Sequence, residues 1–414
     1  MRRSLPVRTP MSPMSPTSPA SPTPRTPRRH AALLALSSAV ALALAACSSD
    51  GSGSSGGSLQ GEGTGDECTI ADPVPVGAAL SLTGAAGSYG ESQRKGLELA
   101  AETLSDDGVT YELAIEDDQT DPRQGITVFE KLASDGVSAI IGPTLSTVAF
   151  QAQPIAQEEG VPVVAISNTA DGITEQGEFI HRVSLTEGQV IPQTVEAAVA
   201  EHDLEDVVVM YSDDDAFTES GYQVFAEALE AEGVDVADTL TFSVADTDFR
   251  PLLTQAKAAD PDAIVVSALI EAAVPLVTQA RELGIDVPIV GGNGFNNPQL
   301  MADAGDAAEG VIVGAAWNSA ATDNAQNTAF LEAYEEANGG APDQFAAQAY
   351  AGLQAVDAAV RAGCSAEPDA VRENLSALQD LDSVLGTLSI DENRDAVHEA
   401  VVQVVDGGQF VALG

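Results

Sequence analysis

The chain has 414 residues and a formal net charge of −46, with 17 Lys and Arg against 63 Asp and Glu. Such an acidic protein is excluded as a natural partner of nucleic acids or anionic lipid surfaces. The length is sufficient for two domains.

The first 46 residues have the three parts of an export signal. Residues 1–30 carry six arginines and no acid, residues 31–46 are apolar apart from two serines, and small residues precede Cys47. The apolar run is shorter than the ~20 residues that span a membrane. Leu44–Cys47 resembles the lipobox of bacterial lipoproteins, so we expect Cys47 to be acylated and to begin the mature chain. The alternative is an ordinary signal peptide that contains a cysteine.

Residues 47–67 are mostly Gly and Ser with a few acids. Such a segment buries too little apolar surface to fold, so we expect a flexible linker with a reach of about 25 Å. Two cysteines follow, Cys68 and Cys364. In an exported protein an even pair favours a disulfide, with two buried free thiols as the alternative.

The remaining chain alternates strand-like and helix-like segments. The predicted strands are 74–82, 111–115, 137–141, 161–166, 207–211, 234–242, 263–267, 287–291 and 311–315. The predicted helices are 89–104, 122–134, 146–158, 189–201, 217–232, 249–259, 272–283 and 297–304. Helices at 325–338, 344–362 and 371–378 and strands at 387–390, 400–405 and 409–413 follow. This alternation predicts an α/β protein with two parallel sheets covered by helices on both faces.

Several segments at strand ends carry a family resemblance. They are VGAALSLTGAAGSYGESQRKGLELAA at 76–101, EDDQTDPRQGITVFEKLASDGVSAIIGPTLS at 116–146, GVPVVAISNT at 160–169, DAAEGV at 306–311 and the segment 345–356. Together they resemble the Leu/Ile/Val-binding protein family, the substrate-binding components of ABC importers. The resemblance implies a type I periplasmic binding protein, with two doubly wound parallel-sheet lobes joined by a three-segment hinge.

The resemblance also implies a domain division and partners. The N-terminal lobe would comprise 68–182 plus 314–391, and the C-terminal lobe 183–313 plus 392–414. We expect a monomer without a cofactor, anchored by Cys47 to the outer face of the cell membrane, that delivers a small ligand to ABC permease and ATPase subunits. A lipid-anchored sensor that uses the same cleft is the alternative.

Two strand ends have polar residues suited to a carboxylate. Ser146 follows the Gly142-Pro143 turn at the start of a predicted helix, whose free N–H groups favour an anion. The resemblance implies that Ser146 and Thr169 bind the ligand's α-carboxylate and that Ser167 offers its backbone carbonyl. Otherwise Ser146 only caps its helix and Thr169 only makes a turn.

Three aromatic residues are further cleft candidates. The resemblance implies that Tyr89 covers the ligand and that Phe217 packs against it, at a position where the family usually has tyrosine. Trp317 follows the strand predicted at 311–315. It contacts the ligand or packs in a lobe core.

Asn293 departs from the family pattern. Amino-acid binders of the family commonly have an acid there that pairs with the ligand's ammonium, and a buried ammonium without a carboxylate is costly. Either Glu271 or an acid of Asp213–Asp215 substitutes, or the ligand is a small carboxylate or amide. The expected ligand is therefore a branched-chain amino acid or a related small amide or carboxylate solute.

The residues give no indication of an enzyme. Gly84, Gly87 and Gly90 are spaced three apart and do not fit the dinucleotide fingerprint Gly-x-Gly-x-x-Gly. The four histidines lie far apart in the sequence, and nothing predicts a nucleophile or a metal site.

Overall fold

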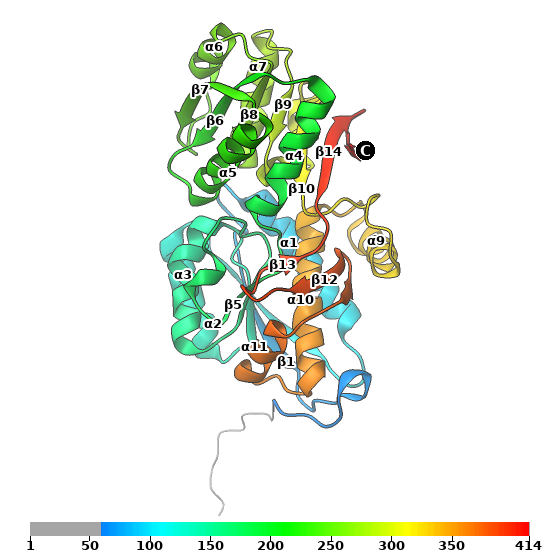
Figure 1. Cartoon of the computed structure of the whole chain (residues 1–414). Helices are drawn as coiled ribbons and strands as arrows, with labels where there is room; N and C mark the ends of the chain where they lie inside the picture. Colours follow the sequence, from blue (N-terminus) through cyan, green and yellow to red (C-terminus); the bar gives the residue numbers. More distant parts are fainter. Residues whose placement is uncertain (1–58, 414) are drawn as a thin grey trace, which may run out of the picture. The chain divides into compact units, whose positions relative to one another are not determined.

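The computed structural model describes residues 59–413, which form two α/β lobes (Figure 1). The first lobe has a parallel sheet in the order β2-β1-β3-β4-β5. Its strands are β1 Val74–Leu80, β2 Tyr111–Asp117, β3 Ala139–Ile141, β4 Val163–Ala165 and β5 Ile180–Arg182. Its helices are α1 Gly87–Leu104, α2 Pro122–Asp135, α3 Ser146–Glu159, α9 Ala325–Asn338, α10 Gln344–Gly363 and α11 Pro368–Ser376.

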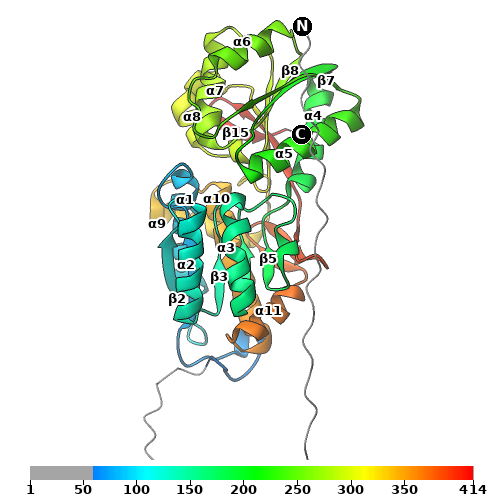
Figure 2. The ribbon, with the colours of Figure 1, turned by 90° about the vertical axis from the view of Figure 1, so that its left-hand side faces the viewer.

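Alternation along the inner strands β1, β3 and β4 buries both faces of this sheet. Ile140 packs with Phe129 of α2, whereas its neighbour Ile141 packs with Leu97 of α1 and Leu353 of α10. Figure 2 shows α2 and α3 side by side on one face of the sheet. The chain therefore needs helices on both sides, as the sequence predicted.

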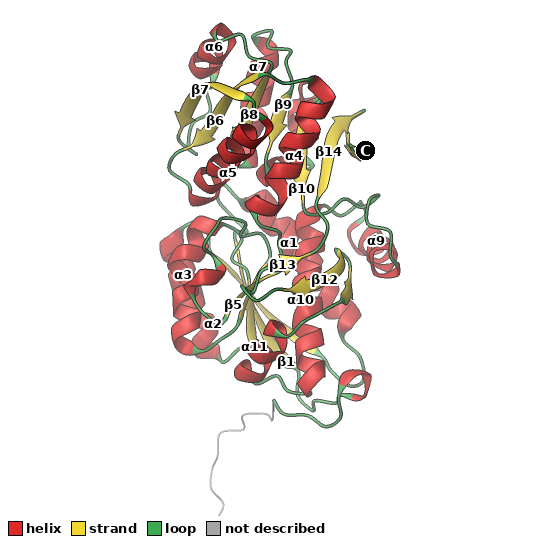
Figure 3. Cartoon of the chain, viewed as in Figure 1, coloured by secondary structure: helices red, strands yellow, loops and turns green. Residues whose placement is uncertain are grey.

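The second lobe has a seven-stranded sheet in the order β15-β14-β10-β9-β8-β6-β7. Its strands are β6 Asp206–Ser212, β7 Asp235–Phe242, β8 Ala263–Ser267, β9 Ile289–Gly291, β10 Ile312–Ala315, β14 Val401–Asp406 and β15 Gln409–Ala412. Its helices are α4 Glu187–His202, α5 Ala216–Glu232, α6 Arg250–Ala258, α7 Ile270–Glu282 and α8 Gln299–Ala304. Strands β6 to β10 are parallel, and β14 pairs antiparallel both with β10 and with β15 (Figure 3).

The chain passes between the lobes three times, at 183–186, 316–324 and 398–400. The expected boundaries at 313/314 and 391/392 need correction. Strand β10 stays in the second sheet to Ala315, and β13 (Ala396–Val397) pairs with β12 (Gly386–Ile390) of the first lobe. The second and third crossings therefore begin two and six residues later than expected.

Part of the expected flexible linker is folded. Residues 59–67 pair with the end of α10 and with the chain before β1: the Gly61 amide donates to the carbonyl of Cys364 (2.9 Å), and Glu62 forms a bridge with Thr69. The sulfur atoms of Cys68 and Cys364 are 2.13 Å apart and form a disulfide beneath this segment. Residues 1–58, which include the leader and Cys47, lie outside the described residues.

Three strands were not predicted: β5, β11 (Leu381–Ser383) and β13. Strands β3, β4 and β9 are equally short but lie in longer apolar runs, whereas β5 (Ile-His-Arg) and β11 (Leu-Asp-Ser) contain polar residues and β13 has only two residues. Strands β11, β12 and β13 form a small antiparallel sheet on the first lobe. Among residues 59–413, no helix is long and apolar enough to cross a membrane.

Candidate functional site

A small cavity lies where the carboxyl ends of the two parallel sheets face each other. The first lobe contributes Tyr89, Thr144, Leu145, Ser146, Ser167 and Phe345, and the second contributes Phe217, Leu269, Asn293 and Gly294. This is the region in which open α/β sheets bind ligands. The cavity holds about 20 Å³, which is room for one water molecule. The lobes are therefore closed on each other, and a larger ligand requires them to part.

The turn after β3 places Ser146 at the cavity. Gly142 has a φ of 116° and lies so close to β1 that a Cβ would be 2.2 Å from the carbonyl oxygen of Ala79. Only glycine fits there. Ser146 is the first residue of α3, preceded by Leu145 as N-cap, and its Oγ accepts a hydrogen bond from the Ala170 amide (3.3 Å). It therefore does not cap the helix, and no described residue accepts its hydroxyl proton.

The Ser167 side chain is already hydrogen-bonded within the first lobe. Its Oγ donates to the carbonyl of Thr144 (2.6 Å) and accepts from Gln93 Nε2 (2.7 Å). These bonds hold the ends of β3 and β4 together. The Ser167 hydroxyl is therefore engaged, and its backbone carbonyl stays the predicted ligand contact.

Thr169 is not among the residues that line the cavity, but the next residue, Ala170, bonds Ser146, which does line it. Thr169 is buried, and its Oγ1 makes no hydrogen bond of good geometry; the acceptor close to it is the Glu187 carboxyl, whose pKa it lowers. Its carbonyl accepts from the amide of Glu187, the first residue of α4 (3.1 Å). A buried hydroxyl without a partner is costly, so this group is a candidate for a ligand contact.

Tyr89 bridges the two lobes. Its hydroxyl donates to the carbonyl of Gly294 (2.8 Å) and accepts from the amide of Ile270 (2.6 Å), while its ring packs on Phe345 with centroids 4.6 Å apart. Burial raises the pKa of the phenol well above its usual value, and the nearby Glu271 raises it further. Tyr89 is therefore neutral and acts as a latch of the closed form.

We expect Tyr89→Phe to weaken ligand binding about tenfold, because both hydrogen bonds that join the lobes are lost while the ring remains. Calorimetry measures this effect. Tyr111→Phe is the matched control, since the Tyr111 hydroxyl bonds Asp357 within the first lobe (2.6 Å). Equal losses in both variants would contradict the role of Tyr89 as a latch.

The structure also accounts for the alternative acids. Asp215 caps α5 through the Thr218 amide (3.0 Å) and accepts from Thr147 of the first lobe (2.6 Å). Asp214 bonds Ser243 at the surface, and Asp213 is exposed. None of the three is a free acid at the cavity.

Glu271 is the second residue of α7 and does not line the cavity. Its Oε2 is buried without a partner, and burial raises the pKa of the carboxyl to about 7. Glu187 shares these properties: it is 2% exposed, both carboxyl oxygens lack partners, and burial raises its pKa to about 7 although the Thr169 hydroxyl and Arg182 lower it. Sequence reasoning missed Glu187, because an acid in the first turn of a helix is ordinarily explained by the helix dipole.

Trp317 is not at the cavity. Its Nε1 donates to the carbonyl of Val384 (3.0 Å), and its ring packs on Phe330 in the core of the first lobe. Of the two roles that the sequence left open for Trp317, the structure shows packing in the lobe core. Leu269 and Phe345 also line the cavity, but no motif in the sequence marked either of them for a ligand.

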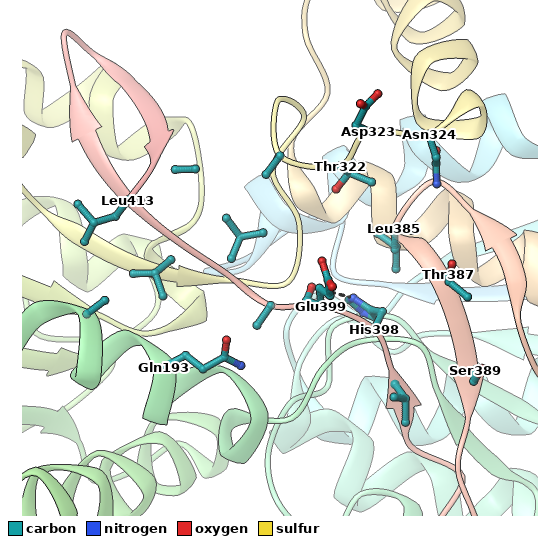
Figure 4. Close-up of a pocket in the computed structure, with 18 of the residues that line it drawn as sticks. Gln193, Thr322, Asp323, Asn324, Leu385, Thr387, Ser389, His398, Glu399 and Leu413 are labelled. Atoms are coloured by element: carbon teal, nitrogen blue, oxygen red, sulfur yellow. Dashed lines mark hydrogen bonds between the residues drawn. The ribbon is translucent and has the colours of Figure 1, made fainter.

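A larger groove of about 1200 Å³ lies at the second and third crossings (Figure 4). Figure 4 shows Gln193 of α4, Asp323 and Asn324 before α9, and His398 and Glu399 of the third crossing around it. It contains none of the candidate ligand residues. Within residues 59–413, no cluster of His, Cys, Asp and Glu could hold a metal ion.

Comparisons with known proteins agree with this geometry. A family model described as "Periplasmic binding protein" matches residues 73–409. A leucine-, isoleucine-, valine-, threonine- and alanine-binding protein of Pseudomonas aeruginosa is 27% identical over 330 residues, which cover 78% of this chain and 87% of that protein.

Solved structures are similar over the same region. A branched-chain amino acid transporter substrate-binding protein of Streptococcus pneumoniae, in complex with isoleucine, is 26% identical with a TM-score of 0.78 and covers 82% of this chain and 99% of its own. A solute-binding protein of R. palustris in complex with benzoate is 25% identical with a TM-score of 0.76, over 83% and 96% of the two chains. These matches confirm the resemblance and the fold class inferred from the sequence. The chain belongs to the periplasmic binding protein family.

Proposed function

We propose that the protein is the extracytoplasmic substrate-binding component of an ABC importer. It captures an aliphatic α-amino acid between its lobes and delivers it to a membrane permease. The observation that carries this proposal is the cavity between the carboxyl ends of the two sheets, which combines apolar walls with hydroxyl groups. The Streptococcus pneumoniae structure, described as a transporter component with isoleucine bound, favours an importer over a sensor.

The first lobe suits the carboxylate of such a ligand. The hydroxyl of Ser146 has a free proton, the N-terminus of α3 begins at the same residue, and the Thr169 hydroxyl has no partner. Hydroxyl and amide donors at a helix N-terminus stabilise an anion.

The cavity walls suit an aliphatic side chain. Tyr89, Leu145, Phe217, Leu269 and Phe345 line it, and all five are buried. Closure of the lobes removes these side chains and the ligand from water, which stabilises the complex by about 25 cal/mol for each Å² of apolar surface. An amino acid with an apolar side chain gains binding free energy from such walls.

The remaining features of the proposal concern the location and partners of the protein. Acylation of Cys47 would anchor it to the outer face of the cell membrane. We propose a monomer that binds one solute and catalyses no reaction. Permease and ATPase subunits complete the importer.

A melting-temperature screen tests the proposed ligand class. Leucine, isoleucine and valine at about a hundred times their dissociation constant should stabilise the protein by about 2.7 kcal/mol. Benzoate and aliphatic amides are the comparison ligands. If none of the three amino acids raises the Tm, the branched-chain assignment is wrong.

Removal of either carboxylate contact should weaken binding. We expect Ser146→Ala and Thr169→Ala each to lower leucine affinity at least tenfold, because each removes a charge-assisted hydrogen bond. Calorimetry measures both variants. Ser105→Ala is the control. The Ser105 Oγ bonds the carbonyl of Ala101 and the amide of Tyr111 at the C-terminal end of α1, whereas Tyr89 reaches the cavity from the start of this helix. Unchanged affinity in the first two variants would overturn the carboxylate site.

A further inference from the structure

The orientation of the Asn293 amide is fixed by its neighbours. Gln344 Oε1 accepts a hydrogen bond from the backbone amide of Ala316 (2.9 Å), a group that can only donate. Gln344 Nε2 is therefore the donor, and it donates to Asn293 Oδ1 (2.5 Å). The carbonyl oxygen of Asn293 is engaged, and its Nδ2 remains for the cavity.

A chain of buried amides reinforces this orientation. Asn296 Nδ2 donates to Gln344 Oε1 (2.7 Å), and Asn296 Oδ1 accepts from Gln403 Nε2 (2.6 Å). Gln403 Oε1 then accepts from Asn318 Nδ2 (2.8 Å), whose Oδ1 accepts from the backbone amide of Ala320 (2.9 Å).

Backbone N–H groups thus fix the chain of amides at two points. Reversing any one amide would bring two donors or two acceptors together in a buried site, which is costly. Asn293 consequently presents a donor, and a donor cannot bind an ammonium group.

Like Glu271, Glu187 does not line the cavity, but its carboxyl lies close to two glycines that adjoin residues of the cavity wall. A Cβ added at Gly221 or at Gly292 would lie 3.6 Å from Glu187 Oε2. Gly292 directly precedes Asn293, and Gly221 lies one helical turn after Phe217, another residue of the cavity wall. Thr169, with its unpartnered hydroxyl, approaches the carboxyl from the first lobe. The carboxyl is therefore enclosed by residues on both sides of the cleft.

The other buried groups near Glu187 do not satisfy its oxygens. Arg182 is the charged side chain that acts on it, but the guanidinium pairs with Asp395 (2.7 Å) and bonds the carbonyls of Asn168 and Ala170. An ionised carboxylate left alone in such a site is costly, so it requires a cation or a proton.

We propose that Glu187 is the acid that pairs with the ammonium group of the ligand, while Asn293, held by Gln344, donates a hydrogen bond to an acceptor atom of the ligand. This inference rests on the proposed function. It assigns the residues of the same site that recognise the ligand's ammonium group and one of its acceptor atoms. Glu187 then takes the role that position 293 cannot fill in this chain. The ligand class is an α-amino acid rather than a simple carboxylate such as benzoate.

Binding should release a proton from Glu187. Without ligand, burial raises the pKa of this carboxyl to about 7, so it holds its proton below that pH. The ligand's ammonium favours the carboxylate, and the proton passes to the buffer. Leucine affinity should therefore rise between pH 5.5 and pH 8. Because Glu271 has a similarly raised pKa, the measurement is repeated in the Glu271→Gln variant.

Calorimetry with leucine and with 4-methylpentanoate, which is leucine without its ammonium, tests the assignment. We expect Glu187→Gln to lower leucine affinity about a hundredfold, to leave 4-methylpentanoate affinity unchanged or higher, and to abolish proton release. The variant should fold, because glutamine has the shape of the protonated carboxyl. Glu271→Gln is the matched control and should change leucine affinity less than threefold.

The possible outcomes separate the two proposals. A large loss in Glu271→Gln with none in Glu187→Gln would overturn the role of Glu187 and leave the proposed function intact. Wild-type protein that binds 4-methylpentanoate as tightly as leucine would show that no cation is recognised. If the wild type binds neither probe nor any branched-chain amino acid, both proposals are wrong.

Discussion

Loss of the disulfide should destabilise the protein by about 4 kcal/mol and lower its Tm by roughly 5–10 °C. Cys68 and Cys364 are 296 residues apart in the sequence, so the bond restricts a very long loop of the unfolded chain. The variant replaces both cysteines with alanine. Both are buried, and alanine avoids placing a polar group in their site.

Ligand affinity should remain within twofold in this variant. The disulfide lies at the end of α10, whereas Phe345 reaches the cavity from the beginning of the same helix. Twenty residues of helix separate these ends by about 30 Å. Reducing agent should lower the Tm of the wild type and leave the variant unchanged. An unaltered Tm in the variant would show that the bond contributes no stability.

The strands predicted from sequence are those whose burial is simplest to read. β6 and β8 are continuous apolar runs because helices cover both faces of the sheet. β5 and β13 escaped prediction because they lack an apolar run: β5 contains His181 and Arg182, and β13 has only two residues. The lobe boundaries were placed too early for a related reason. Whether Ala315 continues β10 is decided by its pairing with Val401, which lies 86 residues away in sequence.

The candidate site was accessible to sequence reasoning where a turn or a strand end marks it. Ser146 follows a Gly-Pro turn, and Tyr89 and Asn293 follow strands, so the carboxyl-end rule places them together. Glu187 and Gln344 could not be found in this way. Each is the first residue of a helix, and its role depends on contacts with residues far away in the sequence.

Breaking the ion pair between Arg182 and Asp395 should cost about 3 kcal/mol of stability, because it leaves a buried charge without a partner. Arg182 is 1% exposed, and both its Nε (2.8 Å) and its NH2 (2.7 Å) bond Asp395 Oδ1. The variant is Asp395→Ala. Urea denaturation followed by fluorescence of Trp317, in the first lobe, measures the change.

The same variant should also weaken leucine binding about tenfold. Arg182 NH1 donates to the carbonyls of Asn168 (3.0 Å) and Ala170 (2.8 Å), and these two residues flank Thr169. An arginine released from Asp395 no longer holds this loop in place, so the Thr169 hydroxyl loses its position.

A double variant distinguishes the two effects. Arg182→Met combined with Asp395→Ala removes the unpaired charge and should recover part of the lost stability. It should not recover leucine affinity, because the hydrogen bonds to Asn168 and Ala170 remain absent. Recovery of both properties together would mean that Arg182 acts only through the stability of the first lobe. Recovery of stability alone would show that the buried guanidinium of Arg182, at the end of β5, connects Asp395 to the loop that contains Thr169.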